Sequence, residues 1–283
     1  MATRTSLVIT TYNWKEALAL CLRSVAGQRV LPHDVVVADD GSRPDTGQLV
    51  RDFARDFPVP LHHAWQEDAG FRAARVRNLG IAATSGDYVV FVDGDMVLHP
   101  EFVADHQALI RPGSYLLGGR LNASQVESTR LLAGGAAQFS VRMPFAPRGS
   151  GGELKRKHVL RLPLLAAYKA SRRKGGVTMS CNLGVWRNDL VRVNGFDHDY
   201  EGWGREDDDL ALRLRHSGVE RRLLRYAGLA IHLWHPTRWP DGVPPNQTLP
   251  NDVLLQRTRA TRATRCARGL DCLIASVELK GAA

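Results

Sequence analysis

Two carboxylates stand two residues apart at the end of an apolar run. Asp93 and Asp95 close the segment YVVFVDGD, residues 88–95. Carboxylate oxygens suit hard cations such as Mg²⁺ and Mn²⁺, which keep coordination positions open for the oxygens of a diphosphate. The pair therefore predicts a divalent-cation site for a phosphorylated ligand, although an ordinary acidic turn produces the same pattern.

A second acidic segment, EGWGREDDD, occupies residues 201–209. Its four successive acids fit the N-terminus of a helix, where the helix dipole favours negative charge. That interpretation leaves Trp203 unexplained. An aromatic side chain between two glycines offers a flat face on which a sugar ring packs well, so the segment is also a candidate sugar site.

Two histidines lie at the end of a late apolar run, Leu229–Leu233: His232 lies within the run and His235 comes two residues after it. Because imidazole suits Mn²⁺ better than Mg²⁺, His232 or His235 would complete a manganese site. The position of the expected strand favours His232. Alternation along the strand offers another outcome, with one histidine in the core and the other on the surface.

The elements that position these residues alternate between strand and helix. Apolar, β-branched runs predict strands at 6–11, 34–39, 59–65 and 88–95, and helical spacing predicts helices near 14–25, 45–56 and 71–83. This pattern favours a mixed, mainly parallel sheet flanked by helices, with ligands at the carboxyl ends of its strands. The chain has neither GxGxxG nor a P-loop, so phosphates must be bound in another way.

Four segments in a fixed order resemble the donor-binding half of the family 2 glycosyltransferases, which have a Rossmann-like GT-A fold: ITTYN, VVVADDGS, GFRAARVRNLGIA and FVDGD. The resemblance implies that Asp93 and Asp95 bridge a metal to the diphosphate of the donor. It also implies nucleotide contacts for Thr10, Tyr12, Asp40, Asp39 as the lesser candidate of its pair, Arg75 and Arg77. A carboxylate facing uracil would accept a hydrogen bond from N3.

The segment around Trp203 resembles the WGxED motif of β-1,4-galactosyltransferases and bacterial chondroitin-type polymerases. The resemblance implies that Trp203 lines the sugar and acceptor site, that Glu206 holds a hydroxyl and that Asp207 is the general base. An inverting transfer needs one such carboxylate to take the proton of the acceptor hydroxyl. In these relatives a downstream histidine also binds the metal.

The formal net charge of +9 over 283 residues calls for an acidic partner. Nucleic acid is not expected, because the C-terminal arginines lack interleaved aromatic residues or a helix-turn-helix frame. Residues 121–174 read as an irregular basic insertion, which suggests contact with an anionic membrane or a phosphorylated glycolipid. The four cysteines form no CxxC pair and are expected to be buried thiols of a cytosolic protein. Together with the basic insertion, this predicts a cytoplasmic protein, peripheral at the inner face of the membrane.

These observations predict a single domain over residues 1–283, with a nucleotide-binding half at 1–110, an acceptor and catalytic half at 111–240 and a basic tail at 241–283. The predicted function is transfer of a hexose or N-acetylhexosamine from a UDP-sugar to a glycan or glycolipid, with Mn²⁺ or Mg²⁺ as cofactor, in bacterial surface polysaccharide or lipopolysaccharide synthesis. The alternatives are a non-catalytic module that binds nucleotide sugars or acidic glycans, and a sugar-phosphate nucleotidyltransferase.

Overall fold

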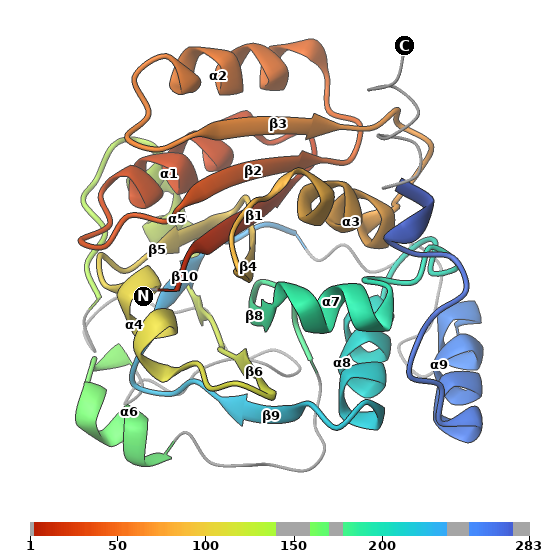
Figure 1. Ribbon diagram of the computed structural model, residues 1–283. Coiled ribbons are helices and arrows are strands. Elements are labelled where there is room, and N and C mark those ends of the chain that lie inside the picture. Colours follow the sequence, from red (N-terminus) through yellow and green to blue (C-terminus); the bar gives the residue numbers. More distant parts are fainter. Residues whose placement is uncertain (1–2, 140–158, 170–177, 237–248, 274–283) are drawn as a thin grey trace.

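The computed structural model describes residues 3–139, 159–169, 178–236 and 249–273 (Figure 1). Strands and helices alternate through its first part, as the apolar spacing predicts. Strands β1, β2 and β4 are buried over nearly their whole length, which is typical of strands covered on both faces. The elements of this part are β1 (Thr5–Thr11), α1 (Lys15–Ala26), β2 (Asp34–Asp39), α2 (Pro44–Ala54), β3 (Leu61–Trp65), α3 (Ala73–Ala83) and β4 (Tyr88–Asp93).

Seven strands form the main sheet, in the order β3-β2-β1-β4-β8-β6-β9. The later strands are β6 (Ser114–Leu117), β8 (Asn182–Trp186) and β9 (Glu220–Leu223). Strand β8 runs antiparallel to both of its neighbours, and the other four pairings are parallel. The prediction of a mixed, mainly parallel sheet is therefore confirmed.

Helices cover both faces of this sheet (Figure 1). The helices beyond β4 are α4 (Phe102–Leu109), α5 (Gln125–Leu132), α6 (Pro163–Lys169), α7 (Arg187–Val193), α8 (Glu206–His216) and α9 (Pro250–Thr261). Leu7 and Ile9 pack on one face with α1 and α4, whereas Val8 and Phe91 pack on the other with α3, α7 and α8. No helix in the described ranges is long and apolar enough to cross a bilayer.

A small second sheet lies beside the end of β4. It contains β5 (Met96–Leu98), β10 (Ala230–His232) and β7 (Leu121–Asn122), in the order β5-β10-β7. His232 pairs with Met96 across β10 and β5, and the backbone N–H of Leu233 donates to the carbonyl of Asp95 at 2.9 Å. Residues more than 130 positions apart in sequence therefore meet next to the Asp93–Asp95 turn.

Two sequence expectations need correction. The expected strand over 88–95 ends at Asp93, and a turn at Gly94 starts the separate strand β5. The expected irregular insertion at 121–174 is wrong where the structure describes it, because β7, α5 and α6 are regular elements. The remainder of that insertion, at 140–158 and 170–174, lies outside the described residues.

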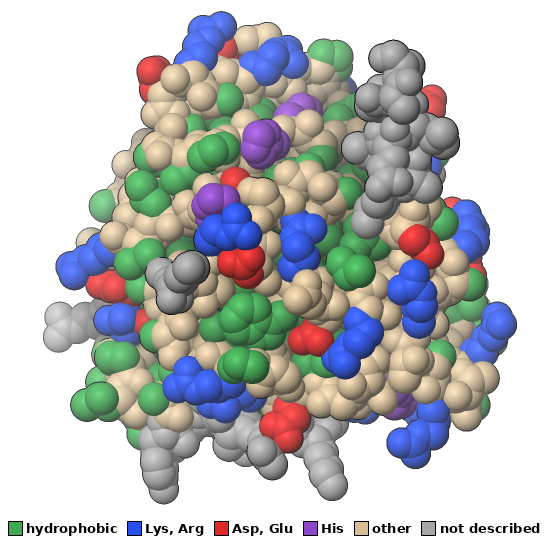
Figure 2. Space-filling model, in the orientation of Figure 1, with side chains coloured by type: hydrophobic (Ala, Val, Ile, Leu, Met, Phe, Trp, Pro, Cys, Tyr) green, Lys and Arg blue, Asp and Glu red, His purple; other side chains and the backbone are tan. Residues whose placement is uncertain are grey.

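The charges on the face shown in Figure 2 are mixed in sign. Lys and Arg side chains lie scattered among Asp and Glu over this face. Opposite charges also form ion pairs at the surface of the molecule, as Arg4 does with Asp87 and Lys15 with Asp45, each at 2.7 Å. On this face the net positive charge is therefore not concentrated in a single basic patch.

Candidate active site

The carboxyl ends of β1, β2 and β4 bring three predicted motifs together. Thr10 pairs in register with Asp93 across β1 and β4, and Thr11 pairs with Asp39 across β1 and β2. Parallel strands end at the same edge of a sheet, and ligands bind at that edge in open α/β folds. The chain segments that were far apart in sequence thus form one polar edge.

Asp39 is turned into the protein. Its side chain is fully buried, with Oδ1 accepting the backbone N–H of Ser42 at 2.8 Å and Oδ2 lying 2.9 Å from Nε2 of His63. One oxygen therefore supports the turn after β2, and the other contacts His63 of β3. This supports the choice of Asp40 over Asp39 as the residue nearer the ligand.

Asp40 is held in one orientation by the segment before α3. Its Oδ2 accepts the backbone N–H of Arg72 at 2.9 Å, and its Oδ1 accepts from the side-chain amide of Gln66. Arg75 in turn donates to Oε1 of Gln66 at 2.6 Å. Burial raises the pKa of Asp40, and these hydrogen bonds oppose the rise. Arg75 thus acts on Asp40 through Gln66.

Thr10 and Tyr12 border the same edge. The ring of Tyr12 is 40% exposed, and its hydroxyl donates to Asp68 at 3.0 Å. The hydroxyl oxygen of Thr10 is buried and has no hydrogen-bond partner among the described residues. An open aromatic face beside an unused hydroxyl suits a nucleoside.

Asp95, His232 and His235 form a cluster that fits a metal ion. Oδ2 of Asp95 lies 3.4 Å from Nε2 of each histidine, and the two Nε2 atoms lie 3.3 Å apart. Ligand atoms about 2.1 Å from one metal ion are separated by about 3.0–3.4 Å. The other oxygen of Asp95 is buried without a hydrogen-bond partner in the part of the chain that the structure describes. The cluster brings both predicted histidines to one point, whereas Asp93 lies outside it.

The pKa values of Asp93 and Asp95 are shifted in opposite directions. Burial raises the pKa of Asp93, and the charge of Asp95 raises it further. Burial also acts to raise the pKa of Asp95, but the hydrogen bond and charge of His232, with the charge of His235, outweigh it and lower the pKa. Asp95 is therefore the stronger candidate for a permanently ionised ligand.

Arg77 of α3 lies between the end of β4 and the start of α8. Its side chain is only 7% exposed, and its guanidinium lies 2.9 Å from Glu206, 3.3 Å from Asp207 and 3.9 Å from Asp93. Burial acts to lower the pKa of Arg77, but the surrounding carboxylates outweigh it and raise the pKa. Arg77 thus faces the start of α8 and the end of β4 simultaneously.

Asp207 is positioned at the first turn of α8. Its Oδ2 accepts the backbone N–H of Ser180 at 2.9 Å, and its other oxygen faces Arg77. Burial raises the pKa of Asp207 to about 7, Arg77 opposes this rise, and the neighbouring Glu206 adds to it. A carboxyl with this pKa can accept a proton near neutral pH, as a general base must.

Trp203 lies in the loop that leads into α8 and is 43% exposed. Gly202 and Gly204 on either side have φ angles of 73° and 92°, which only glycine adopts without strain. The N–H of Gly202 donates to the carbonyl of Phe71 at 2.9 Å. The Trp203 loop is therefore tied to the segment that also holds Asp40.

Arg120 was missed by the sequence analysis. It immediately precedes β7, and because side chains alternate along a strand it shares a face with Asn122, which pairs with His232. Its Nε is buried and lacks a hydrogen-bond partner within the described ranges, and its charge acts to lower the pKa of both Asp93 and Asp95. The signal in the sequence is a lone arginine after two glycines at the end of a buried strand.

Two known protein families match consecutive parts of the chain. Residues 6–158 match the family described as Glycosyl transferase family 2, and residues 164–236 match the N-terminal domain of galactosyltransferase. Chondroitin synthase from Escherichia coli is 27% identical over 80% of this chain and 34% of its own length. Validoxylamine A glucosyltransferase from Streptomyces hygroscopicus subsp. limoneus is 29% identical over 78% of this chain and 49% of its own length. The chain thus spans half or less of these two relatives.

A solved structure shares the fold. The 1–349 fragment of TarS from S. aureus, in complex with UDP-GlcNAc, superposes with a TM-score of 0.58 at 18% identity, covering 91% of this chain and 66% of that one. The sheet order and the flanking helices are therefore those of a GT-A fold. Since the matched region of the first family covers more than half of the sequence, the chain belongs to glycosyltransferase family 2.

Proposed function

We propose that the chain is an inverting, metal-dependent glycosyltransferase that moves a hexose or N-acetylhexosamine from a UDP-sugar to a hydroxyl of a glycan or glycolipid. The observation that carries this proposal is the network around Arg77, in which Asp207 lies near the aspartate that ends β4. A partly buried carboxyl with a pKa of about 7 beside a site for a diphosphate is suited to transfer to a hydroxyl.

The donor nucleotide is proposed to bind at the ends of β1 and β2. Thr10 and Tyr12 would contact the nucleoside, and Asp40 would accept a hydrogen bond from uracil N3. Asp39 supports the turn, and Arg75 steadies Asp40 through Gln66. The structures of TarS with UDP and with UDP-GlcNAc support a uridine donor.

Asp95, His232 and His235, with Asp93 nearby, are proposed to hold Mn²⁺ or Mg²⁺. A bound cation would neutralise charge on the departing diphosphate. The histidines favour Mn²⁺, since imidazole nitrogen suits it better than Mg²⁺. The guanidinium of Arg77 lies 3.9 Å from Asp93, so this carboxylate has a charged partner with or without the ion.

In the proposed reaction the acceptor hydroxyl oxygen attacks the anomeric carbon as the bond from that carbon to the phosphate oxygen breaks. Asp207 takes the proton of the hydroxyl, and UDP leaves with the bonding electron pair. Attack from the face opposite the diphosphate inverts the configuration. Glu206 would hold a second hydroxyl, and Trp203 would pack against a sugar ring. Arg77 keeps both carboxylates in place.

The acceptor is proposed to be a bacterial surface polysaccharide or lipopolysaccharide precursor at the inner face of the cytoplasmic membrane. The names of the E. coli chondroitin synthase and a Pasteurella multocida hyaluronan synthase support polymeric acceptors. The validoxylamine glucosyltransferases are named for a different acceptor. We retain the division into a donor half at 1–110, an acceptor half at 111–240 and a basic tail at 241–283 as part of this proposal.

A panel of UDP-sugars tests the function directly. With Mn²⁺, the wild-type chain should release UDP from one donor, and EDTA or Asp95→Ala should abolish the release, because Asp95 contributes to the only group of described residues with metal-ligand spacing. Product analysis with a glycan acceptor separates transfer from hydrolysis. Absence of turnover with every donor would reject the enzyme and favour a non-catalytic nucleotide-sugar module.

Arg120→Ala should weaken UDP binding about 10- to 100-fold, the value of a hydrogen bond to a charged group. The expectation follows from the placement of Arg120 near Asp93 and Asp95, where a diphosphate would lie. Calorimetric titration with UDP in Mn²⁺ measures the change. Arg111→Ala, an exposed arginine before β6, is the matched control and should bind UDP like the wild type. Equal affinities for the two variants would contradict a phosphate contact by Arg120.

The pH dependence of transfer should report Asp207. A general base works only when deprotonated, so kcat should fall as the pH drops below about 7, the pKa to which burial raises this carboxyl. Above pH 7 the ionised form predominates and this limb of the profile becomes flat. An acidic limb near pH 4, where an unperturbed aspartate titrates, would argue against this role for Asp207.

A further inference from the structure

Helix α9 and the segment after it lie beyond both matched family regions, which end at residue 236. This C-terminal segment, residues 249–273, nevertheless packs against the loop at 201–205 and against α8 (Figure 1). The loop carries Trp203 and leads directly into Glu206 and Asp207. Its conformation is therefore set partly by residues that neither family match includes.

Asn251, in the first turn of α9, makes the central contacts. It is 4% exposed, and its side-chain amide points its N–H donors at the carbonyls of Gly204 at 2.8 Å, Glu201 at 3.2 Å and Trp203 at 3.4 Å. Three carbonyls of one short loop thus converge on a single amide. A buried donor shared in this way fixes backbone orientation, because leaving these acceptors without a partner is costly.

Asp252 supports the other end of the loop. Its Oδ1 accepts from Nε of Arg205 at 2.6 Å, and its Oδ2 accepts the N–H of Leu249 at 2.8 Å, which caps α9. Arg205 has a left-handed backbone, with φ of 75°, which is uncommon for a residue other than glycine. The ion pair therefore stabilises the conformation in which the loop turns into α8.

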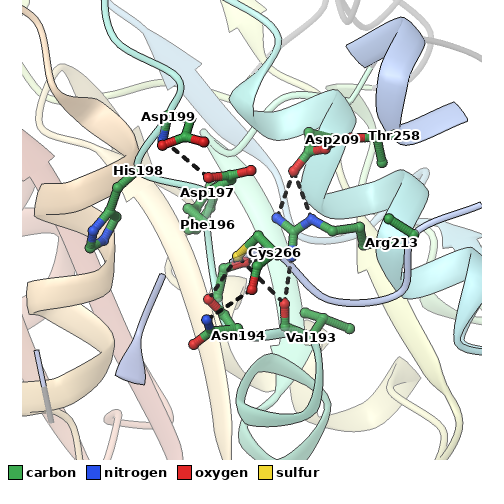
Figure 3. Close-up of polar contacts among 12 residues, drawn as sticks. Val193, Asn194, Phe196, Asp197, His198, Asp199, Asp209, Arg213, Thr258 and Cys266 are labelled. Carbon is green, nitrogen blue, oxygen red and sulfur yellow. Dashed lines mark hydrogen bonds and ion pairs between the residues drawn. The ribbon is translucent and has the colours of Figure 1, made fainter. Parts of the chain in front are cut away.

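Helix α9 is hydrogen-bonded to α8, the helix that begins with Glu206 and Asp207. Thr258 donates to Oδ1 of Asp209 at 2.7 Å, while Oδ2 of Asp209 pairs with the buried Arg213 at 2.7 Å (Figure 3). Arg213 also donates to the carbonyl of Val193, and the thiol of Cys266 lies against the carbonyl of Asn194 (Figure 3). Helix α8 and the C-terminal segment therefore share a buried polar network.

We propose that Asn251 is a positioning residue that holds the Glu201–Gly204 loop so that Trp203 faces the acceptor sugar, and that helix α9 thereby contributes to acceptor specificity. The donor side is separate, since the hydrogen bonds given by the Asn251 side chain in the described part of the chain all go to the loop and none goes to the ends of β1, β2 and β4. The inference rests on the proposed role of Trp203, and the experiment below distinguishes the failure of one from the failure of the other.

The test compares Asn251→Ala and Asn251→Asp with Thr258→Val as the matched control. The aspartate has the shape of asparagine but offers the loop carbonyls no donor. With p-nitrophenyl β-glucoside and β-N-acetylglucosaminide as acceptor probes, both Asn251 variants should lose about 10- to 100-fold in kcat/KM, mainly through the KM of the acceptor, since small displacements of a site have effects of this size. Their Kd for UDP should remain that of the wild type. Thr258→Val removes a contact between α9 and α8 but none to the loop, and should keep the wild-type KM for the acceptor.

Two further measurements separate positioning from loss of stability. In Asn251→Ala, hydrogen exchange should accelerate in a peptide spanning 201–205 more than in the strands of the main sheet. The double variant with Trp203→Ala should lose no more activity than Trp203→Ala alone, because a residue that acts through another adds nothing once that one is removed.

If the Asn251 variants do not fold, Asp252→Ala, which releases Arg205, should show the same acceptor effect. An active wild type whose Asn251 and Asp252 variants keep the acceptor KM would overturn the inference, whereas a wild type without transfer counts against the proposed function itself.

Discussion

Asp207→Asn is expected to lower kcat for transfer by about 10²–10⁴-fold, the contribution of a general base. The substitution keeps the shape of the side chain, and the amide oxygen can still accept the N–H of Ser180. It removes the ability to take the acceptor proton. Binding of UDP should change little, because the proposed nucleotide contacts lie at the ends of β1 and β2. Single-turnover and steady-state rates with the preferred donor, together with UDP titration, check both parts.

The neighbouring Asp208 provides the control for this prediction. Its Oδ1 accepts the N–H of Thr178 and its Oδ2 pairs with Arg205, so it belongs to the same acidic turn without facing Arg77. Asp208→Asn should therefore lose far less activity than Asp207→Asn. A kcat for Asp207→Asn close to the wild-type value would reject Asp207 as the base, and equal losses in the two variants would indicate a general effect of charge on α8.

The sheet and the edge that carries the candidate site were predictable because they depend on local sequence. The apolar runs at 6–11, 34–39 and 88–95 indicated three parallel strands and the edge at which they end, although the last strand stops at Asp93. A histidine beside the Asp93–Asp95 pair was also expected, with His232 favoured over His235, while alternation along the strand offered one histidine in the core and the other on the surface. The structure shows both reaching Asp95, because β10 ends at His232 and the chain beyond it no longer alternates.

What the sequence could not provide is contact between distant segments. The arginines of α3 look equivalent in sequence, yet Arg75 reaches Gln66, whereas Arg77 is buried among carboxylates. In the sequence, Asn251 is only one polar residue of the predicted basic tail, and its role comes from hydrogen bonds to three backbone carbonyls at residues 201, 203 and 204. The cysteines illustrate the same limit, because Cys272 is exposed although all four were expected to be buried.

Arg77→Ala is expected to reduce the free energy of unfolding by about 3–5 kcal/mol, the cost of removing one partner from a buried ion pair. The guanidinium is 7% exposed and faces Glu206, Asp207 and Asp93, so its loss leaves three carboxylates without their shared cation. Urea unfolding measures the change. Arg265→Ala is the control, because its ion pair with Asp271 is about half exposed and should contribute less than about 1 kcal/mol.

The same cation should also set the pH dependence of the reaction. Arg77 acts against the burial that raises the pKa of Asp207, since a positive charge favours the ionised carboxylate. Arg77→Lys keeps a charge, although not the planar fork that reaches two carboxylates together. In this variant, which should lose less stability than Arg77→Ala, the acidic limb of the kcat profile should move to higher pH as the contact with Asp207 weakens. If Arg77 served only the packing of α3 against α8, stability would fall and the limb would stay near pH 7. A shift of the limb therefore identifies Arg77 as the group that keeps the base ionised where α3, β4 and α8 meet.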